Sequence, residues 1–532
     1  KEHLDENNYI PVNLEKKEID EFYYGLSNKA LWPLFHYFIE YSVFSQNQWD
    51  SYVEVNKKFA EAVINNVEDG DIIWVHDYQL LLCPKMIRDQ KPNITLGFFL
   101  HIPFPSFEIF RIFPWREELL KGILGADQIG FHTYDYVRHF LSSVKRILKY
   151  DVDFNRIDLG SRKVVVDTFP MGIDFEKFNS AAKKRLFEKS KSKSELKKQL
   201  EYHKKTSTDG KLILSIDRLD YTKGVINRIK AFEIFLKKYP QYLEKVRLVM
   251  LTVPSRAEVS DYKNLKRETD EIVGRVNGEF ATVNWTPIWY YYRNMDFEDL
   301  VDLYTTSDIA MITPVRDGMN LVAKEFVSTR VDKDGVLILS EMAGASKELF
   351  QSILVNPFDL NNMAEALFQA VNMTKNEQIE RNKRMQIRLK RYNVRHWAKE
   401  FMRGLEQQSK IKVKSTATKI DNIQLSKIKA NFDFSSKKIF FLDYDGTLVE
   451  FNDKPKLAVP SSRVKKLLQG ISGLKNTEVV IISGRDQSFL SKHFDHFKVN
   501  LVAEHGNYRK EINGSWIDLN FQEKNDWMLD IL

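Results

Sequence analysis

Strand-length apolar runs recur along most of the chain, and each is followed by a segment with helical periodicity. Their hydrophobicity is continuous rather than alternating, which is typical of strands that are buried on both faces. Such strands belong to parallel sheets whose faces are covered by helices. The sequence therefore predicts an α/β fold. The runs lie at residues 71–78, 94–105, 126–133, 163–174, 211–220, 246–255, 307–318, 335–344 and 352–359.

The strand and helix rhythm restarts twice, which predicts several domains in series. A lysine-rich stretch and the turn-like STDG interrupt it first, and the polar segment QQSKIKVKSTATKIDN interrupts it again. With 532 residues, the chain has room for about three domains. We expect two doubly wound, Rossmann-like domains that face each other, followed by another α/β domain. The expected ranges are 1–206 and 207–406 for the Rossmann-like domains, 407–435 for a linker and 436–532 for the last domain.

Composition narrows the classes of partner and compartment. Hydrophobic residues make up 43% and the net charge is +7, so a folded chain with a mild basic excess is expected. This balance suits phosphorylated small molecules better than nucleic acid. The single Cys83 excludes intrachain disulfides and favours a reducing compartment. No signal peptide and no membrane-spanning run is recognisable, so we expect a soluble cytoplasmic protein, with no membrane partner, whose true start lies upstream.

The segment SIDRLDYTKGV places two cations just after a predicted strand. Ligands of open parallel sheets bind at the carboxyl ends of strands. Arg218 and Lys223, with Gly224 opening the next helix, could hold a diphosphate, because both cations and the helix dipole favour concentrated negative charge. The alternative is a surface arginine and lysine that pair with Asp217 and Asp220.

The segment PVRDGMNLVAKEF follows another predicted strand and carries two carboxylates. Asp317 lies in a loop with Gly318, where backbone amides can approach a ligand. Glu325 falls two turns into the next helix on roughly the same side. A carboxylate there can accept both hydroxyls of a ribose or sugar. The alternative is an aspartate that caps the helix and a glutamate that faces solvent.

Two further polar residues end adjacent strands of the first domain. Asp77 closes the run WVHDYQLL, and His101 closes FFLHIPFP. Pro103 and Pro105 stiffen the loop after His101, as the wall of a preformed pocket would require. Either residue could also be an ordinary polar group at a strand end.

Taken together, these segments resemble the trehalose-6-phosphate synthase family from about residue 10 to residue 405. That resemblance implies a GT-B fold and a retaining glycosyltransferase without cofactor, which moves glucose from UDP-glucose to glucose 6-phosphate. Two fixed cations could stabilise the departing diphosphate, and a cleft between the domains would close around the substrates. The resemblance rests on FYYGLSNKALWPLFHY, WVHDYQLL, FLHIPFPSFEIFR, SIDRLDYTKGV, TVPSRAEV and PVRDGMNLVAKEF, in that order.

The resemblance also implies residue roles. Arg218 and Lys223 would hold the UDP diphosphate, Glu325 the ribose, and Asp317 the hydroxyls of the donor glucose. His101 would lie over the donor glucose near the reacting centre. The implied donor-binding set is Arg218, Lys223, Asp317, Gly318, Met319, Asn320, Leu321 and Glu325, and the implied catalytic set is His101, Arg218, Lys223 and Asp317. The implied acceptor-binding set is Tyr23, Trp32, Asp77 and Arg256, with Tyr24 as a rival to Tyr23.

One departure concerns the beginning of the chain. The family's pattern opens with a glycine-rich loop that carries an arginine for the acceptor phosphate, and this would precede Lys1. We therefore expect an incomplete first Rossmann-like domain and weak turnover by the chain as given.

The run FFLDYDGTL begins the last domain and ends in two aspartates. Asp443 and Asp445 can project toward one site, one as nucleophile and the other as general acid, with Mg²⁺ screening a phosphate. The alternative is a turn rich in aspartate and glycine. The motif resembles haloacid-dehalogenase-like phosphatases, and Glu504 in EHG resembles their trehalose-6-phosphate phosphatase branch. The implied phosphatase-like residues are Asp443, Asp445, Ser483 and Glu504, with Asp443 and Asp445 as an incomplete metal site.

The same resemblance implies a lysine and another acidic pair after Ser483. Asp526 and Asp530 do not substitute for them, so we expect little or no phosphatase activity from this chain. Two alternatives to the synthase stay open: a glucosylglycerol-phosphate synthase with a different acceptor, and a non-catalytic sensor of sugar phosphates. The sequence also leaves open whether the protein forms a homo-oligomer.

Overall fold

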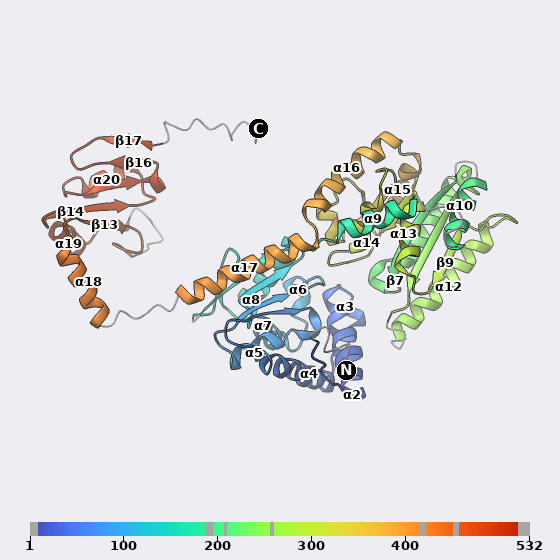
Figure 1. The fold of residues 1–532 in the computed structure, drawn as a ribbon, viewed down its shortest axis with the longest axis horizontal. Helices are drawn as coiled ribbons and strands as arrows, with labels where there is room; N and C mark the ends of the chain where they lie inside the picture. Colours follow the sequence, from blue (N-terminus) through green and yellow to red (C-terminus); the bar gives the residue numbers. More distant parts are fainter. Residues whose placement is uncertain are drawn as a thin grey trace. The chain divides into compact units, whose positions relative to one another are not determined.

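The computed structural model describes residues 9–160, 162–186, 195–206, 210–255, 260–414, 422–450 and 457–519. The chain forms two compact units, Lys1–Lys414 and Ser415–Leu532 (Figure 1). Sheets with helices against them make up both units, which confirms the predicted α/β class. None of the described helices is long and apolar enough to cross a bilayer.

The first sheet of the first unit has the order β1-β2-β3-β6-β5-β4. Its four leading strands are parallel, and the last two run antiparallel at one edge. The strands are β1 (Ile72–His76), β2 (Thr95–Phe99), β3 (Gln128–Phe131), β4 (Asp151–Asp153), β5 (Arg156–Asp158) and β6 (Lys163–Thr168). The helices are α2 (Lys16–Glu18), η1 (Ile19–Leu31), α3 (Trp32–Phe35), η2 (Ile39–Tyr41), α4 (Gln46–Ile64), η3 (Tyr78–Leu80), α5 (Cys83–Gln90), α6 (Phe107–Phe110), α7 (Arg116–Ile123) and α8 (Tyr134–Ile147).

The second sheet is parallel throughout and has the order β12-β11-β10-β7-β8-β9. This is the doubly wound order, and its direction of winding reverses between β7 and β10. The strands are β7 (Lys211–Arg218), β8 (Val246–Val253), β9 (Ile288–Tyr292), β10 (Ile309–Ile312), β11 (Val336–Ser340) and β12 (Ile353–Val355). The helices are α9 (Phe175–Leu186), α10 (Glu195–Thr206), η5 (Tyr221–Lys223), α11 (Val225–Lys238), η6 (Pro240–Tyr242), α12 (Ser260–Phe280), α13 (Phe297–Thr306), α14 (Leu321–Thr329), η7 (Gly344–Lys347), α15 (Leu360–Asn372) and α16 (Lys375–Arg391).

Helices α9 and α10 belong to the second sheet, although the sequence placed them before the expected boundary at residue 206. Phe175, Leu196 and Leu200 join the apolar core of that sheet. Asn179 Nδ2 on α9 donates a hydrogen bond to Ser328 O on α14 at 2.9 Å. Burial of these apolar side chains holds α9 and α10 against the second sheet. Because the surface of both helices is charged, this packing could not be predicted from the sequence.

Helix α17 (Val394–Lys414) returns to the first sheet, so the packing also departs from the boundary at 406. Its Phe401 lies over β2 and β3, where a Cβ added to Gly97 or Gly130 would come within 2.7 or 2.9 Å of the Phe401 ring. The glycines therefore let the helix lie close to the sheet. Where it is described, the expected linker 407–435 is largely helical, because α17 extends to Lys414 and α18 spans Asn422–Phe434.

The second unit contains one five-stranded sheet, β13-β14-β15-β16-β17, of which the first three strands are parallel. The first strand of this sheet is largely solvent-facing on one side, since Ile439 is 52% and Phe441 64% exposed. The strands are β13 (Lys438–Asp443), β14 (Thr477–Ile482), β15 (Asn500–Ala503), β16 (Tyr508–Lys510) and β17 (Trp516–Asp518). The helices besides α18 are α19 (Ser462–Ser472), α20 (Gln487–Phe494) and η9 (Glu504–Gly506).

Candidate functional site

An ion pair lies at the point where the second sheet reverses its winding. Lys223 follows β7, Asp317 follows β10, and Lys223 Nζ lies 2.5 Å from Asp317 Oδ2. Their side chains are only 11% and 14% exposed. Burial alone would raise the pKa of Asp317, but the charge and hydrogen bond of Lys223 lower it below its ordinary value. The sequence predicted that these two residues share a site, and the structure brings them into contact.

Backbone contacts hold the loops after β7 and β10 together. Val315 N donates to Thr222 O at 2.8 Å. Gly224 has a φ of +67°, and a Cβ there would lie 2.6 Å from Thr313 O, so a side chain would be strained and would clash. Asp220 caps η5 by accepting from Thr222 N at 3.0 Å. The local sequence thus orients Lys223 toward Asp317.

A fully buried arginine that the sequence analysis missed supports the same loop. Arg228, on α11, pairs with Asp217 at 2.8 Å and donates to Lys223 O at 3.0 Å. Asp220 accepts from Tyr262 Oη at 3.0 Å as well as from Thr222. The alternative in which Lys223 pairs with Asp217 and Asp220 is therefore wrong. The signal available in the sequence was a lone arginine on the apolar face of the helix that follows SIDRLDYTKGV.

Arg218 and Arg316 reach aromatic rings that come from the first domain. The guanidinium of Arg218 lies 5.5 Å from the centre of the Trp32 ring, and that of Arg316 lies 3.9 Å from the centre of the Tyr37 ring. Tyr136 Oη also donates to Asp317 O at 3.4 Å. Side chains of the two Rossmann-like domains thus meet around the ion pair. Arg218 is exposed, which leaves it accessible to a ligand.

Glu325 is half-buried on α14 and accepts a hydrogen bond from Tyr304 Oη at 2.6 Å. Burial raises the pKa of Glu325 above its ordinary value, and the Tyr304 hydrogen bond and the charge of Lys177 oppose that rise. Asn320, with a φ of +71°, caps α14 by accepting from Ala323 N at 3.1 Å. The alternative of a capping Asp317 and a solvated Glu325 is therefore wrong.

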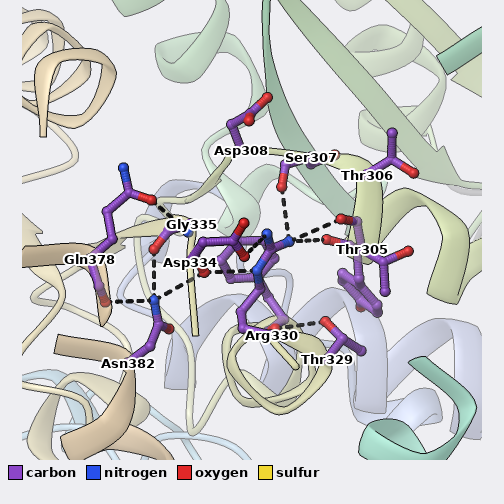
Figure 2. Close-up of polar contacts among 12 residues, drawn as sticks. Thr305, Thr306, Ser307, Asp308, Thr329, Arg330, Asp334, Gly335, Gln378 and Asn382 are labelled. Carbon is purple, nitrogen blue, oxygen red and sulfur yellow. Dashed lines mark hydrogen bonds and ion pairs between the residues drawn. The ribbon is translucent and has the colours of Figure 1, made fainter. Parts of the chain in front are cut away.

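Figure 2 shows how Arg330 joins α14 to the end of α13. Its guanidinium donates to Tyr304 O at 2.6 Å and to Ser307 O at 2.9 Å, two of the carbonyls at the end of α13. It also bonds the Asp334 carboxylate at 2.6 Å. Terminal helix carbonyls need such donors. Arg330 therefore fixes the spacing of the two helices that carry Tyr304 and Glu325.

Gly318 allows the loop after β10 to touch the loop after β2. A Cβ at Gly318 would lie 2.3 Å from His101 O, so only glycine fits there. Met319 is buried in the core of the second sheet, and the partly buried Leu321 packs against that core. Of the predicted donor residues, Met319 therefore has its side chain in the core, and its O accepts from Ala345 N at 2.7 Å.

His101 and Asp77 lie together at the ends of β1 and β2, as the sequence predicted. His101 N donates to Asp77 Oδ1 at 3.3 Å, and His101 Nε2 lies 3.0 Å from His76 Nδ1. Burial, and secondarily the charge of His76, lower the pKa of His101 to about 4. The imidazole is therefore neutral near pH 7. Asp77 has a φ of +71°, which indicates a constrained turn.

The predicted acceptor residues have different environments. Trp32 is buried and Tyr23 is 37% exposed, while Tyr24 is partly buried. Tyr23 and Tyr24 are neighbours whose rings meet edge to face at 5.2 Å. Arg256 lies outside the described residues.

His36 is a buried residue of the site that the sequence analysis missed. Its Nδ1 lies 2.7 Å from Trp32 O, and its ring lies 4.2 Å from the Trp32 ring. Burial lowers the pKa of His36 to about 4, and the charges of Asp220, Lys223 and Asp317 also act on it. The signal available was its place one turn after Trp32 in FYYGLSNKALWPLFHY.

In the second unit, the phosphatase-like residues gather at the carboxyl ends of three neighbouring strands, β13, β14 and β15. Arg485 binds both oxygens of Asp445, at 2.9 and 2.5 Å, and lowers the pKa of Asp445 through these hydrogen bonds. Ser483 Oγ accepts from Arg485 N at 3.1 Å, and Glu504 N donates to Arg485 O at 3.0 Å. Arg485 therefore links the predicted residues, and the sequence analysis did not single it out.

The donor set near Asp443 fits a magnesium ion only in part. Asp443 is exposed and offers carboxylate oxygens, which suit Mg²⁺, although its Oδ2 accepts from Thr447 Oγ1 at 3.2 Å. Both oxygens of Asp445 already bind Arg485. Within the parts of the chain that the structure describes, no group of three or more His, Cys, Asp or Glu is arranged to hold a metal. The described residues alone do not form a complete magnesium site.

Two family models match this chain. The model for glycosyltransferase family 20 covers residues 1–407, and the model for trehalose-phosphatase covers residues 441–532. A bifunctional trehalose-6-phosphate synthase/phosphatase of Thermoproteus tenax is 42% identical over 514 residues, which are 96% of this chain and 69% of that protein. An alpha,alpha-trehalose-phosphate synthase (UDP-forming) of Dictyostelium discoideum is 38% identical over 501 residues, 94% of this chain and 67% of that protein.

Solved structures agree with these relatives. A UDP-forming trehalose-phosphate synthase from Burkholderia xenovorans superposes with a TM-score of 0.71 and 36% identity, over 75% of this chain and 87% of that one. A trehalose-6-phosphate synthase from E. coli bound with UDP-2-fluoro glucose gives a TM-score of 0.70 and 34% identity, over 74% of this chain and 86% of that one. The predicted architecture of two facing Rossmann-like domains followed by a phosphatase-like domain is confirmed. This chain belongs to glycosyltransferase family 20, among the UDP-forming trehalose-6-phosphate synthases, and carries a trehalose-phosphatase region after its transferase region.

Proposed function

We propose that the first unit transfers glucose from UDP-glucose to glucose 6-phosphate with retention, giving trehalose 6-phosphate and UDP. The observation that carries this proposal is the enclosed Lys223–Asp317 pair beside Arg218 at the reversal point of the second sheet. Anionic groups of nucleotides bind at this place in doubly wound sheets. The relatives named above as UDP-forming synthases, and one solved relative in complex with glucose-6-phosphate, support the choice of donor and acceptor.

On the donor side, Arg218 and Lys223 bind the diphosphate and stabilise its charge as it leaves. Glu325 accepts the ribose hydroxyls, and Asp317 accepts hydroxyls of the donor glucose. The backbone of Gly318, Met319 and Asn320, at the start of α14, faces the diphosphate, and Leu321 backs the nucleotide. These roles need only the fixed cations of the chain, so the proposed transfer has no cofactor.

On the acceptor side, the neutral His101 lies near the reacting carbon and Asp77 holds the acceptor sugar. Tyr23, Trp32 and Arg256 bind the 6-phosphate. The bond from the glucose carbon to the phosphate oxygen breaks on the face where the acceptor oxygen bonds. The proton of the acceptor hydroxyl passes to the leaving phosphate, which accounts for retention without a carboxylate nucleophile.

For the second unit, we propose a phosphatase role only where a lysine and a further acidic pair complete the site; Asp443 would then be the nucleophile and Asp445 the general acid, with Mg²⁺ as the required ion. The supporting observations are the match to trehalose-phosphatase and the gathering of both residues with Ser483 and Glu504 at one edge of the sheet. A cytoplasmic location is also proposed, since the single Cys83 is a free, buried thiol.

A competition assay tests the proposed transfer. The full chain is offered UDP-glucose with glucose 6-phosphate and glycerol 3-phosphate together, and the products are separated. We expect UDP release coupled to trehalose 6-phosphate. Product from glycerol 3-phosphate alone would instead favour a glucosylglycerol-phosphate synthase. UDP binding without product from either acceptor would favour a sugar-phosphate sensor.

A further inference from the structure

A groove of about 1040 Å³ lies at the amino ends of β8 and β9, at the edge of the second sheet opposite to Arg218 and Lys223. Arg247 is at the start of β8 and pairs with Leu212 at the start of β7, whereas Arg218 ends β7. The stretch from Leu212 to Arg218 spans about 20 Å at the usual rise of a strand. The groove is therefore separate from the proposed donor site. Its lining includes Lys198, Tyr202, Lys245, Arg247, Trp285 and Trp289.

Arg247 is a buried cation that faces this groove. It is only 5% exposed, and its Nε donates to Thr286 O at 2.8 Å. Its guanidinium lies 3.9 Å from the centre of the Trp289 ring. Among the described residues, no carboxylate pairs with Arg247. Burial lowers the pKa of Arg247 to about 10, so the group stays charged at neutral pH. A charge that is buried without a counter-ion is costly, and an anion in the groove would relieve that cost.

The surroundings of Arg247 combine further cations and flat rings with two exposed carboxylates, Glu195 and Glu244. Lys245 and Lys198 are exposed at the rim, where Lys198 makes a loose pair with Glu195 at 3.4 Å. Trp285 is only 4% exposed and belongs to the core beneath the groove, where its Nε1 donates to Val246 O at 3.1 Å. Tyr202 contributes a ring that is 69% exposed. Aromatic faces bind sugar and base rings, while guanidinium and ammonium groups bind phosphate.

We propose that this groove is a second binding site for a small phosphorylated metabolite that carries a ring. Its phosphate would bind Arg247 and Lys245, and its sugar or base ring would lie against the aromatic side chains. The binding of this metabolite does not depend on the proposed glucose transfer, since none of the groove residues belongs to the donor or acceptor sets.

Hydrogen exchange of the full chain, followed by mass spectrometry, tests the site. The probes are glucose 6-phosphate, UDP and inorganic phosphate at millimolar concentration. We expect at least one of the two ring-bearing probes to protect peptides that cover residues 243–249 and 283–291. Inorganic phosphate alone should protect these peptides with an apparent Kd about tenfold higher, because it lacks the ring contact. Protection by glucose 6-phosphate assigns a sugar phosphate, and protection by UDP assigns a nucleotide.

Three variants separate this site from the donor site. Arg247→Gln should raise the apparent Kd for the protecting probe about tenfold or more, since it removes a charge-assisted hydrogen bond. Arg218→Ala and the exposed control Arg267→Gln should leave groove protection unchanged. If Arg247→Gln lowers the melting temperature of the free protein, Lys245→Gln at the rim is used as the test variant instead. It should raise the apparent Kd of the protecting probe about threefold.

Two results would overturn the proposal. One is the absence of protection at 243–249 and 283–291 with every probe. The other is protection that survives both Arg247→Gln and Lys245→Gln, or that disappears in Arg218→Ala, which would assign the signal to the donor site. Because none of these readouts measures glucose transfer, failure of the groove and failure of the proposed function are distinguishable.

Discussion

Both units place a carboxylate beside a cation at the carboxyl ends of parallel strands, but the two pairs differ in their exposure to solvent. In the first unit, the side chains of Lys223 and Asp317 are 11% and 14% exposed. In the second unit, Arg485 and Asp445 are 13% and 29% exposed, and Asp443 is exposed. Charges interact more strongly where water is excluded. The Lys223–Asp317 pair is therefore expected to contribute more to binding and catalysis than the Arg485–Asp445 pair.

The enclosure of the first site comes from the facing Rossmann-like domain. The loop after β10 touches His101 through Gly318, and rings from the first domain lie beside Arg218 and Arg316. A preorganised charge in such a cleft needs little rearrangement when a diphosphate departs. Enclosure by a facing domain therefore distinguishes the Lys223–Asp317 pair from the Arg485–Asp445 pair.

The largest expected effect is on Lys223. Lys223→Met should lower the rate of UDP release from UDP-glucose and glucose 6-phosphate about 1000-fold, because a fixed cation at the leaving group is lost. Steady-state kinetics of UDP formation measures the change. The control Lys230→Gln removes an exposed lysine of the neighbouring helix α11 and should keep the rate. A Lys223→Met enzyme within about threefold of the wild-type rate would contradict the role of the enclosed pair.

A smaller effect is expected at Glu325. Glu325→Gln should weaken UDP binding about tenfold, since a neutral amide replaces the carboxylate that accepts the ribose hydroxyls. Tyr304→Phe is the matched comparison, because it removes only the hydrogen bond to Glu325 and leaves the charge. Calorimetric titration with UDP measures both. An equal loss in the two variants would show that the position of Glu325, and not its charge, determines binding.

Sequence patterns could predict most of this site because its residues end strands. Arg218, Lys223, Asp317, Asp77 and His101 follow apolar runs, and parallel strands bring their carboxyl ends to one edge. Residues that support the site without lying at a strand end gave weaker signals in the sequence. Arg228 lies within α11, Arg330 follows the last residue of α14, and His36 follows the last residue of α3. Arg228 binds Asp217 and Arg330 binds the Tyr304 carbonyl, and both partners come from other elements that the tertiary fold brings near.

The sequence also did not reveal on which sheet the helices near the domain boundaries pack. Helices α9 and α10 follow the first sheet in sequence but pack on the second, and α17 does the reverse. Their surfaces are highly charged, so the apolar contacts that decide their place, such as Leu200 and Phe401, are few and not periodic enough to assign to a sheet. In β13, by contrast, partly buried and exposed side chains alternate, so this apolar run alone does not indicate burial.

The pH dependence of stability should have opposite signs at Asp317 and Glu325. The pKa of Asp317 is lowered from its ordinary 3.8, so its contribution is present above that value and is lost as the pH falls below it. The pKa of Glu325 is raised from its ordinary 4.5, so its contribution is present at low pH and is lost as the pH rises through the raised pKa.

Melting temperatures of variants measure this difference. As the pH falls from about 5 to about 3, the wild type should lose its stability advantage over Asp317→Asn, and as the pH rises from about 4 to about 7, Glu325→Gln should become more stable relative to the wild type, each on the order of 2 °C. Glutamine keeps an oxygen that accepts from Tyr304, so the Glu325→Gln comparison isolates the charge. Trends of the same sign in both variants would contradict the opposite environments of the two carboxylates.

The smallest effect is expected in the second unit. Arg485→Met should cost about 1 kcal/mol of the free energy of unfolding of that unit, because the pair with Asp445 is partly solvated and both groups can be hydrated when separated. It should also raise the pKa of Asp445 toward its ordinary value, since the hydrogen bonds of Arg485 are the main cause of its lowering. Denaturant unfolding at low and high salt measures the cost, with the exposed Lys492→Met on α20 as control. A loss of several kcal/mol that does not depend on salt would show that this pair is as enclosed as Lys223 and Asp317, and the contrast between the two units would fail.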